Sequence, residues 1–465
     1  MRTLKLAVLA AALGAWCGAA FADPAIQRVT PQSKQQVQLS FSAVSQKASP
    51  AVVNVYAARV VVQRRMISDD PFLRQFGLGM GVPQQRVEQS LGSGVIVRGD
   101  GVIVTNHHVV EHAQALKVVL ADKREFDARV ILDDAQSDLA VLRIDAKGLP
   151  TLAFADTNQA QVGDMVLAIG NPFGLTQTVT SGIISALART GVTDNVYGSF
   201  IQTDAAINQG NSGGALVDMN GDLVGINTAI FSMGGGSNGV GFAVPAEMVR
   251  RVVDSALSGG RIVRAWLGVK GQPLTQAFAT RIGLPSPTGL LISDVYASGP
   301  AARAGLKPGD VVLTVNGAAV SDEAGAKYQA GVAKPGSTIA LETLRDGKKR
   351  IVNVTAEAAP RSPAADARAL GGATPLAGAQ VANLSPAEAE EVGFDAFAQG
   401  VYIKAIAPGG PAARVGFRPG DIIRQVNGQA VRTSADLERL LRQPAQAWQI
   451  AVERGGQLMQ LQVRV

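Results

Sequence analysis

Short apolar runs rich in β-branched residues follow one another from about residue 90 to residue 245. Examples are LGSGVIV, LKVVLA, LAVLRI and DLVGINTAI, each closed by glycine or polar residues. Strands at this spacing, without helical patterns between them, indicate an all-β barrel or sandwich. At residues 246–257 the period changes, because the apolar positions of AEMVRRVVDSAL fall at helical spacing. We therefore expect one helix to close a first, mainly β domain.

Two other stretches lack any such period. Residues 63–89 carry several glycines and two prolines, and we predict that they form one long loop. Residues 356–375 are dominated by alanine, contain three prolines and show no strand-like run. This composition predicts a linker between domains.

The last third of the chain contains an internal repeat. GPAARAGLKPGDVVLTVNG at residues 299–317 and GPAARVGFRPGDIIRQVNG at residues 410–428 match at twelve of nineteen positions. Two copies are too few for a solenoid, which needs at least about three. We therefore predict a first domain over residues 23–260, followed by two tandem modules over residues 261–355 and 376–465.

The first residues of the chain indicate export. Arg2 and Lys5 precede an apolar stretch, and Ala20-Phe21-Ala22 has the small residues of a cleavage site. We predict a secretory signal peptide over residues 1–22 and no stable membrane span, because the apolar run is too short to cross a bilayer. The only cysteine, Cys17, lies within this segment. The mature chain then has no disulfide, thiolate metal site or cysteine nucleophile.

Composition and charge exclude some partners. The 465-residue chain is 47% hydrophobic and has a net charge of +6, and its longest basic run is Lys348-Lys349-Arg350. No patch of this sequence indicates nucleic-acid binding. No Gly-rich nucleotide fingerprint is present, so we expect no ATP and no other cofactor.

Candidate chemistry lies in three short segments. The three histidines, His107, His108 and His112, all occur in TNHHVVEH, Asp138 occurs in QSDLAVL, and Ser212 lies among glycines in INQGNSGGAL. His108 and His112 could share a metal on a helix, but no second ligand cluster exists, so we expect no metal site. The order His, Asp, Ser on a β background is that of chymotrypsin-type proteases. The glycines then either form a simple turn or leave the backbone N–H groups beside a nucleophile accessible to a substrate oxygen.

These motifs together resemble the HtrA (Deg) family of serine endoproteases, and especially its periplasmic Do-like members. The residues that carry the resemblance are LGSGVIV, TNHHVV, SDLAVL, AIGNPFGL, GNSGGAL and INTAIFSMGGGSNGVGFAVP, and the two repeats resemble PDZ cores. The resemblance implies a mainly β fold, with a chymotrypsin-like double β-barrel followed by two α+β PDZ domains. The family pattern T-N-x-H-V also selects His108 over His107.

The resemblance assigns roles residue by residue. Ser212 would be the nucleophile, His108 the general base and Asp138 its partner, with an oxyanion hole at Gly210, Asn211 and Ser212. The expected substrate-binding residues of the protease domain are Ile207, Gly210, Asn211, Thr228, Ala229, Ile230, Phe231 and Ser232. Those of the first PDZ-like module are Leu267, Gly268, Val269, Lys270 and Gly271. In the second module the matching residues 376–379 depart from the family pattern, which leaves peptide binding open beside a role in assembly.

The implied function is ATP-independent degradation of misfolded or damaged periplasmic proteins, a stress-response and quality-control activity. We expect cleavage after small or medium aliphatic residues, because the predicted pocket is uncharged. We also expect the PDZ modules to bind exposed apolar C-terminal peptides. The alternative is mainly a chaperone whose protease domain rests inactive. The resemblance also implies a homotrimer, which could assemble further into larger cages. Phe72 and Phe76 would contact a neighbouring protomer. The expected activation loops are residues 188–197, 207–210 and 228–239.

Overall fold

The computed structural model describes residues 40–66, 80–171, 177–192, 197–208, 210–230, 238–259 and 262–464. Of residues 60–66, 80–89, 229, 230 and 464 it describes only the backbone. The predicted signal peptide, Phe72, Phe76, Phe231 and Ser232 lie outside the described residues. Within the described part of the chain, no helix is both long enough and apolar enough to cross a membrane.

The first half of the N-terminal domain is a closed antiparallel barrel with the strand order β1-β2-β3-β6-β5-β4. Its interior is apolar: Val95, Ile103 and Leu142 are fully buried on three different strands. Burial of such side chains is the main stabilising contribution to a barrel of this kind. The strands are β1 (Val52–Met66), β2 (Met80–Arg98), β3 (Val102–Thr105), β4 (Ala115–Val119), β5 (Glu125–Asp134) and β6 (Leu139–Ile144).

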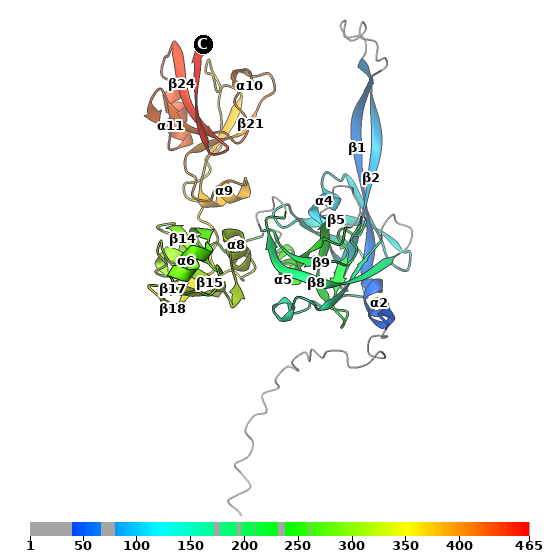
Figure 1. The fold of residues 1–465 in the computed structure, drawn as a ribbon. Helices are drawn as coiled ribbons and strands as arrows, with labels where there is room; N and C mark the ends of the chain where they lie inside the picture. The colour runs from blue at the N-terminus through cyan, green and yellow to red at the C-terminus, as the bar shows by residue number, and fades with distance from the viewer. Residues whose placement is uncertain are drawn as a thin grey trace, which may run out of the picture. The chain divides into compact units, whose positions relative to one another are not determined.

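The predicted loop over residues 63–89 is wrong where these strands extend into it. Residues 63–66 belong to β1 and residues 80–89 to β2, and the two strands continue past the barrel as a paired ribbon (Figure 1). The pairing runs from Val52 opposite Val95 to Met66 opposite Met80, with one irregularity near Arg64. Because the barrel already fixes the register, the main-chain ladder can continue without a period-two apolar pattern.

The second half of the domain is another closed barrel, with the order β10-β11-β12-β9-β8-β7. The two closed barrels confirm the predicted double-barrel fold. The predicted helix over residues 246–257 is also confirmed: it is α5 (Ala246–Leu257), which buries Val249 and Val252 completely. The strands are β7 (Met165–Gly170), β8 (Thr178–Thr190), β9 (Ser199–Thr203), β10 (Ala215–Val217), β11 (Leu223–Ile230) and β12 (Gly241–Pro245). Short helical segments are α2 (Ser42–Ala48), η1 (Ser49–Ala51), α4 (His107–Val110) and η2 (Thr157–Gln159).

The first repeat, residues 262–357, is an antiparallel sheet with the order β13-β14-β15-β17-β18, in which β16 pairs with β15. Its own core includes Leu290, Ile292 and Leu341. The strands are β13 (Val269–Pro273), β14 (Leu290–Val295), β15 (Val311–Val315), β16 (Ala318–Ala319), β17 (Thr338–Arg345) and β18 (Lys348–Thr355). The helices are α6 (Gln276–Arg281), α7 (Pro300–Arg303) and α8 (Glu323–Gly331).

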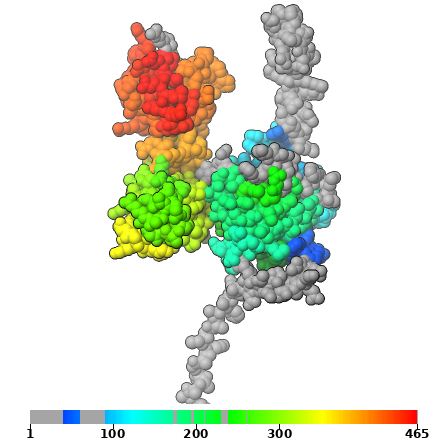
Figure 2. Space-filling view, viewed as in Figure 1, coloured from blue at the N-terminus to red at the C-terminus, as the bar shows by residue number. Residues whose placement is uncertain are grey.

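The second repeat, residues 358–464, has the same order with one more strand at the edge, β19-β20-β21-β22-β24-β25. This repeat, orange to red in Figure 2, has a hydrophobic core of its own. The strands are β19 (Arg368–Ala369), β20 (Ala379–Asn383), β21 (Val401–Ile406), β22 (Ile422–Val426), β23 (Gln429–Ala430), β24 (Ala447–Arg454) and β25 (Gln457–Arg464). The helices are α9 (Pro386–Glu391), α10 (Pro411–Val415) and α11 (Ser434–Leu441).

The extra strand lies in the segment that we predicted as a linker without strands, so that prediction is wrong at β19. A two-residue strand has no period to detect, and this one forms through pairing with β20.

The repeated Pro-Gly-Asp sequence has the same structural role in both modules. Asp310 is 2% exposed and accepts hydrogen bonds from the N–H of Lys307, at 2.8 Å, and from Arg345 of β17. Asp421 is fully buried and makes the matching bonds to Arg418 N–H and to Arg454 of β24. A buried carboxylate is tolerated only when it is paired in this way. The motif therefore fixes a turn to a distant strand.

Candidate active site

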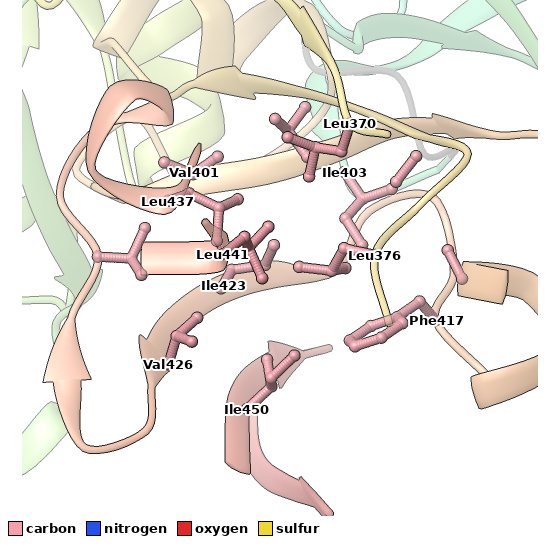
Figure 3. Close-up of a cluster of buried hydrophobic side chains, with 14 of the residues drawn as sticks. Leu370, Leu376, Val401, Ile403, Phe417, Ile423, Val426, Leu437, Leu441 and Ile450 are labelled. Carbon is pink, nitrogen blue, oxygen red and sulfur yellow. The ribbon is translucent and has the colours of Figure 1, made fainter. Parts of the chain in front are cut away.

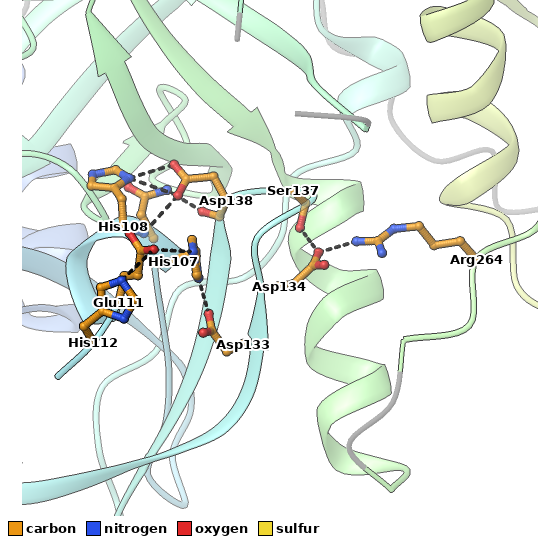
Figure 4. A network of polar contacts seen from close by, with 10 residues as sticks. His107, His108, Glu111, His112, Asp133, Asp134, Ser137, Asp138 and Arg264 are labelled. Atoms are coloured by element: carbon orange, nitrogen blue, oxygen red, sulfur yellow. Dashed lines mark hydrogen bonds and ion pairs between the residues drawn. The ribbon is translucent and has the colours of Figure 1, made fainter. Parts of the chain in front are cut away.

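His108 and Asp138 meet at the rim of the first barrel. His108 lies in the single-turn helix α4, directly after β3, and Asp138 precedes β6 (Figure 4). The ring Nδ1 of His108 is 2.9 Å from both carboxylate oxygens of Asp138, and the His108 N–H donates to Oδ1 at 3.1 Å. Because a carboxylate at this position accepts, Nδ1 carries the proton. This contact fixes the tautomer and the orientation of the ring.

The backbone of Asp138 is held in an unusual conformation. Its φ is +54°, in the left-handed region that few non-glycine residues adopt. The side chain of Asn106 donates to the Asp138 carbonyl oxygen at 2.8 Å, and both residues are buried. The surrounding bonds therefore stabilise a strained backbone that aims the carboxylate at His108.

A threonine of the second barrel completes the surroundings of the carboxylate. Thr228, on β11, donates its hydroxyl to Asp138 Oδ2. Burial alone would raise the pKa of Asp138, but the hydrogen bonds from His108 and Thr228 hold it below the ordinary value. The carboxylate is therefore ionised at neutral pH and can stabilise an imidazolium.

The two adjacent histidines have different partners. His107 Nδ1 is 2.6 Å from Asp133, whereas His108 faces Asp138 (Figure 4). Nearby, Asp134 accepts hydrogen bonds from Ser137 and Arg264. The geometry thus separates His107 from His108, which the order of residues alone did not.

Ser212 lies in a tight turn whose glycines are required by close backbone contacts. Gly213 has φ +83°, and a Cβ there would lie 2.1 Å from the carbonyl oxygen of Ser93. A Cβ on Gly214 would lie 2.2 Å from the carbonyl oxygen of Ile169. Both distances are too short for any side chain, so the glycines allow the turn to pack against β2 and β7.

The hydroxyl of Ser212 faces the second barrel. Its Oγ donates to the carbonyl oxygen of Thr228 at 3.2 Å. Among the described residues, no hydrogen bond joins Ser212 to His108. Within the same part of the chain, no atom accepts a bond from the Ser212 N–H, which leaves that donor available to a substrate oxygen.

A second serine holds the turn from the first barrel. Ser93, fully buried on β2, donates its hydroxyl to the carbonyl oxygen of Gly210 at 2.6 Å and accepts from Asn171 N–H at 2.9 Å. Its own N–H donates to the Ser212 carbonyl oxygen at 2.8 Å. Ser93 thus holds the peptide groups 210–211 and 212–213, one before and one after the peptide that joins Asn211 to Ser212.

The residues predicted to line the specificity pocket are only partly described. Ile207 is 1% exposed and packs against β12, where a Cβ on Gly241 would lie 2.8 Å from Ile207 Cδ1. Thr228 is 5% exposed, and its hydroxyl is engaged by Asp138. The structure gives the backbone of residues 229 and 230 in β11, and it leaves Phe231 and Ser232 outside the described residues.

The predicted peptide-binding loops of the two repeats share one frame. In the first repeat, Gly268 has φ +72° and its carbonyl oxygen accepts from Tyr296 N–H at 2.9 Å. In the second, Gly378 has φ +87° and accepts from Ala407 N–H at 2.8 Å. Leu267 precedes the first glycine, and Val269, Lys270 and Gly271 follow in β13, an edge strand.

Sequence reasoning gave no role to Ser93, Asn106 or the hydroxyl of Thr228. A usable signal exists for the first two: Ser93 interrupts the apolar run LGSGVIV, and Asn106 follows a fully buried strand. Buried polar side chains need hydrogen-bond partners, so a polar residue at such a position predicts a hydrogen bond to another segment.

Comparisons with known proteins agree with this architecture. A trypsin-like peptidase domain model matches residues 92–226, and PDZ domain models match residues 265–356 and residues 402–447. The first range lies within the two barrels, and the other two lie in the two repeats.

Two relatives are similar over almost the whole chain. Periplasmic serine endoprotease DegP of Escherichia coli (strain K12) is 37% identical over 477 residues, covering 97% of this chain and 97% of the relative. Periplasmic pH-dependent serine endoprotease DegQ of the same strain is 36% identical over 469 residues, covering 100% and 99%. The solved structure of HtrA-type protease AlgW with tripeptide is 44% identical, with a TM-score of 0.52 and coverage of 69% and 96%. The chain therefore belongs to the HtrA family of serine endopeptidases, with a trypsin-like protease domain followed by two PDZ domains.

Proposed function

We propose that this endopeptidase degrades misfolded or damaged proteins in the periplasm without ATP, with Ser212, His108 and Asp138 as its catalytic triad. The observation that carries the assignment is the double contact between His108 Nδ1 and the ionised Asp138 carboxylate. A ring held in this way presents Nε2 as the proton acceptor, and the carboxylate stabilises the imidazolium that forms.

The reaction follows from these groups. Ser212 Oγ attacks the scissile carbonyl carbon, and its proton passes to His108 Nε2. The oxyanion that forms accepts hydrogen bonds from the N–H groups of Gly210 and Ser212. His108 then protonates the leaving amine, which gives an acyl-enzyme. Water loses a proton to His108 and attacks the ester carbon, and His108 returns that proton to Ser212 Oγ as the ester bond breaks and the second product leaves.

Attack requires Ser212 to turn first. Its hydroxyl donates to the Thr228 carbonyl oxygen, so the side chain must rotate toward His108 when substrate arrives. Removal of one oxyanion donor typically lowers the rate about 100- to 1000-fold, so the backbone at Gly210 matters as much as the rotation.

Substrate choice follows from an uncharged pocket. We propose cleavage after small or medium aliphatic residues such as Val, Ala or Ile, because Ile207 is apolar and none of the predicted lining residues is ionisable. The first PDZ domain would bind apolar C-terminal peptides by strand addition at β13. A peptide library cleaved mainly after Arg or Lys would contradict this specificity.

Assembly and location are parts of the same proposal. We propose a secreted homotrimer whose mature chain begins at Asp23. The location is supported by the sequence of residues 1–22 and by the two relatives named as periplasmic endoproteases, whereas the trimer follows only from the resemblance to the HtrA family. N-terminal sequencing of exported protein and the mass of the purified particle test both points. A retained leader or a monomer would contradict them.

The test of the triad is replacement of Ser212 by Ala, with unfolded casein as substrate. We expect proteolysis to be lost. The matched control is Ser181→Ala, which removes an exposed serine from β8 of the same barrel and leaves the rate unchanged. Proteolysis by the Ser212→Ala variant at the rate of the control would remove Ser212 from the mechanism.

A second candidate function is chaperone activity with a protease domain that rests inactive. The resting bond from Ser212 to the Thr228 carbonyl oxygen favours it. The same Ser212→Ala chain separates the two activities. If it still suppresses aggregation of unfolded casein, holding and cleaving are independent activities; if suppression disappears with cleavage, the chaperone candidate fails.

A further inference from the structure

The second PDZ domain differs from the first at the edge where PDZ domains bind peptides. In the first domain, β13 is the end strand of the described sheet. In the second, the equivalent strand β20 is covered by β19, which comes from the segment between the domains. Extended peptides bind PDZ domains by adding a strand at this edge. The position of an added strand is therefore already filled by the chain itself.

The main chain of this segment is paired along β20 over its length. Arg368 lies opposite Val381 in an antiparallel ladder, and Asn383 N–H donates to the Ala365 carbonyl oxygen at 2.7 Å. At the other end, Leu370 N–H donates to the Ala379 carbonyl oxygen at 2.8 Å. The segment over residues 365–370 thus occupies the backbone hydrogen-bonding groups of β20 that an external peptide would need.

The last residue of the segment lies where the end of a peptide would lie. The Leu370 carbonyl oxygen accepts a hydrogen bond from Gly378 N–H at 2.9 Å, within the loop that we matched to the carboxylate-binding loop of the first domain. The Leu370 side chain is 7% exposed and belongs to the core cluster with Leu376, Leu437 and Leu441 (Figure 3). The aliphatic side chain of Leu370 is thus buried among these core residues, which we call the Leu370 pocket, and its carbonyl oxygen accepts a hydrogen bond from the loop.

The helix on the other side of the groove also holds the segment. Arg368 forms ion pairs with Glu438 of α11 and with Asp366, the latter at 2.9 Å. Ser434, the first residue of α11, donates its hydroxyl to Asp366 at 2.6 Å. The segment therefore contacts both β20 and α11.

We propose that residues 365–370 are an internal ligand of the second PDZ domain. The groove beneath them is a peptide site for an extended chain with an aliphatic last residue and a basic residue two positions earlier. A tethered ligand has an effective concentration of about millimolar, so an external peptide of equal affinity displaces it only when its own concentration approaches that value. The second domain is closed to external peptides until the segment leaves.

The test counts peptide sites on the full-length chain with Ser212→Ala, which prevents cleavage of the probe. The probe is a synthetic peptide with the sequence of residues 362–370, SPAADARAL, and a free C-terminus. Isothermal titration gives the number of sites per chain. The readout is binding, so it does not depend on the catalytic assignments.

Two variants open the groove in different ways. Leu370→Asp places a charge in the apolar pocket, and Arg368→Glu puts a third carboxylate beside Asp366 and Glu438 without altering the pocket. The control is Ala369→Asp, which adds the same charge at an exposed neighbour. Thermal unfolding shows whether each variant folds, and Arg368→Glu decides the test if the Leu370 variant does not.

We expect the number of sites to rise by one in the folded opening variants and to stay unchanged in the control. Binding at the first PDZ domain contributes equally to all chains and cancels. Two results overturn the proposal. One is that the folded Arg368→Glu variant shows no added site. The other is that the chain carrying only Ser212→Ala already binds the probe at its second PDZ domain.

Discussion

Replacement of Thr228 by Val tests whether the second barrel supports the catalytic pair of the first. The change removes one hydroxyl, keeps the branched shape of the side chain, and leaves the carbonyl oxygen that Ser212 contacts. The lost interaction is the hydrogen bond from Thr228 to the Asp138 carboxylate.

The magnitude follows from the charge on the acceptor. A hydrogen bond to a charged group contributes about 1.5–3 kcal/mol. If this stabilisation is needed when His108 becomes an imidazolium, kcat/KM falls about 10- to 150-fold, since each 1.36 kcal/mol is a factor of ten. The bond from Thr228 also lowers the pKa of Asp138, so its removal raises that pKa and reduces ionisation first at acidic pH.

The assay is the initial rate of casein cleavage as a function of substrate concentration and pH. Thr157→Val is the matched control, because Thr157 donates to the Glu247 carboxylate at 2.7 Å away from the site. We expect the loss in the Thr228 variant alone, growing toward low pH. Equal kcat/KM values for the two folded variants would refute the role given to Thr228.

Two further changes test other parts of the structure. Ser93→Ala should lower kcat about tenfold with little change in KM, because it frees the Gly210 carbonyl and loosens the oxyanion hole without touching substrate. The control is Ser255→Ala, which removes a buried hydroxyl from α5. A change in KM alone would contradict the role given to Ser93. Asp310→Asn should flatten the pH dependence of stability in the first PDZ domain. Burial opposes ionisation, but the hydrogen bonds from Arg345 hold the pKa of Asp310 below its ordinary value. Its stabilisation is therefore complete well above the ordinary pKa and is lost as the pH falls through the folded pKa. Thermal unfolding between neutral and acidic pH checks this, and an unchanged pH profile would count against it.

Much of the fold could be predicted because its signals are local. The apolar runs that became barrel strands and the helical period of α5 are visible in short windows. The ribbon of β1 and β2 beyond the barrel and the strand β19 were missed, because both exist through pairing with a distant partner. Residues 368 and 369 form a strand through their pairing with β20, and the neighbouring Leu370 packs into the core of the second repeat.

The candidate site divides in the same way. His108, Asp138 and Ser212 could be proposed from their order and from the family pattern, which also chose between two adjacent histidines. The hydroxyls of Ser93 and Thr228 belong to no such pattern: Ser93 is visible only as a polar residue within an apolar run, and Thr228 has no signal of its own. Their partners are far away in sequence, and only the packing of β2 and β11 against the other barrel brings them together.

Because of these two hydroxyls, the geometry of the candidate site depends on how the two barrels pack against each other. Ser93 of the first barrel holds the Gly210 carbonyl of the second, and Thr228 of the second barrel holds the Asp138 carboxylate of the first. The carbonyl of Gly210, beside the proposed oxyanion hole, and the carboxylate that orients His108 are thus each held by the barrel that does not carry them. A shift of one barrel against the other would lengthen both bonds together. In the mechanism that we propose, serine protease activity is therefore expected to depend on the relative position of the two barrels, in addition to Ser212, His108 and Asp138.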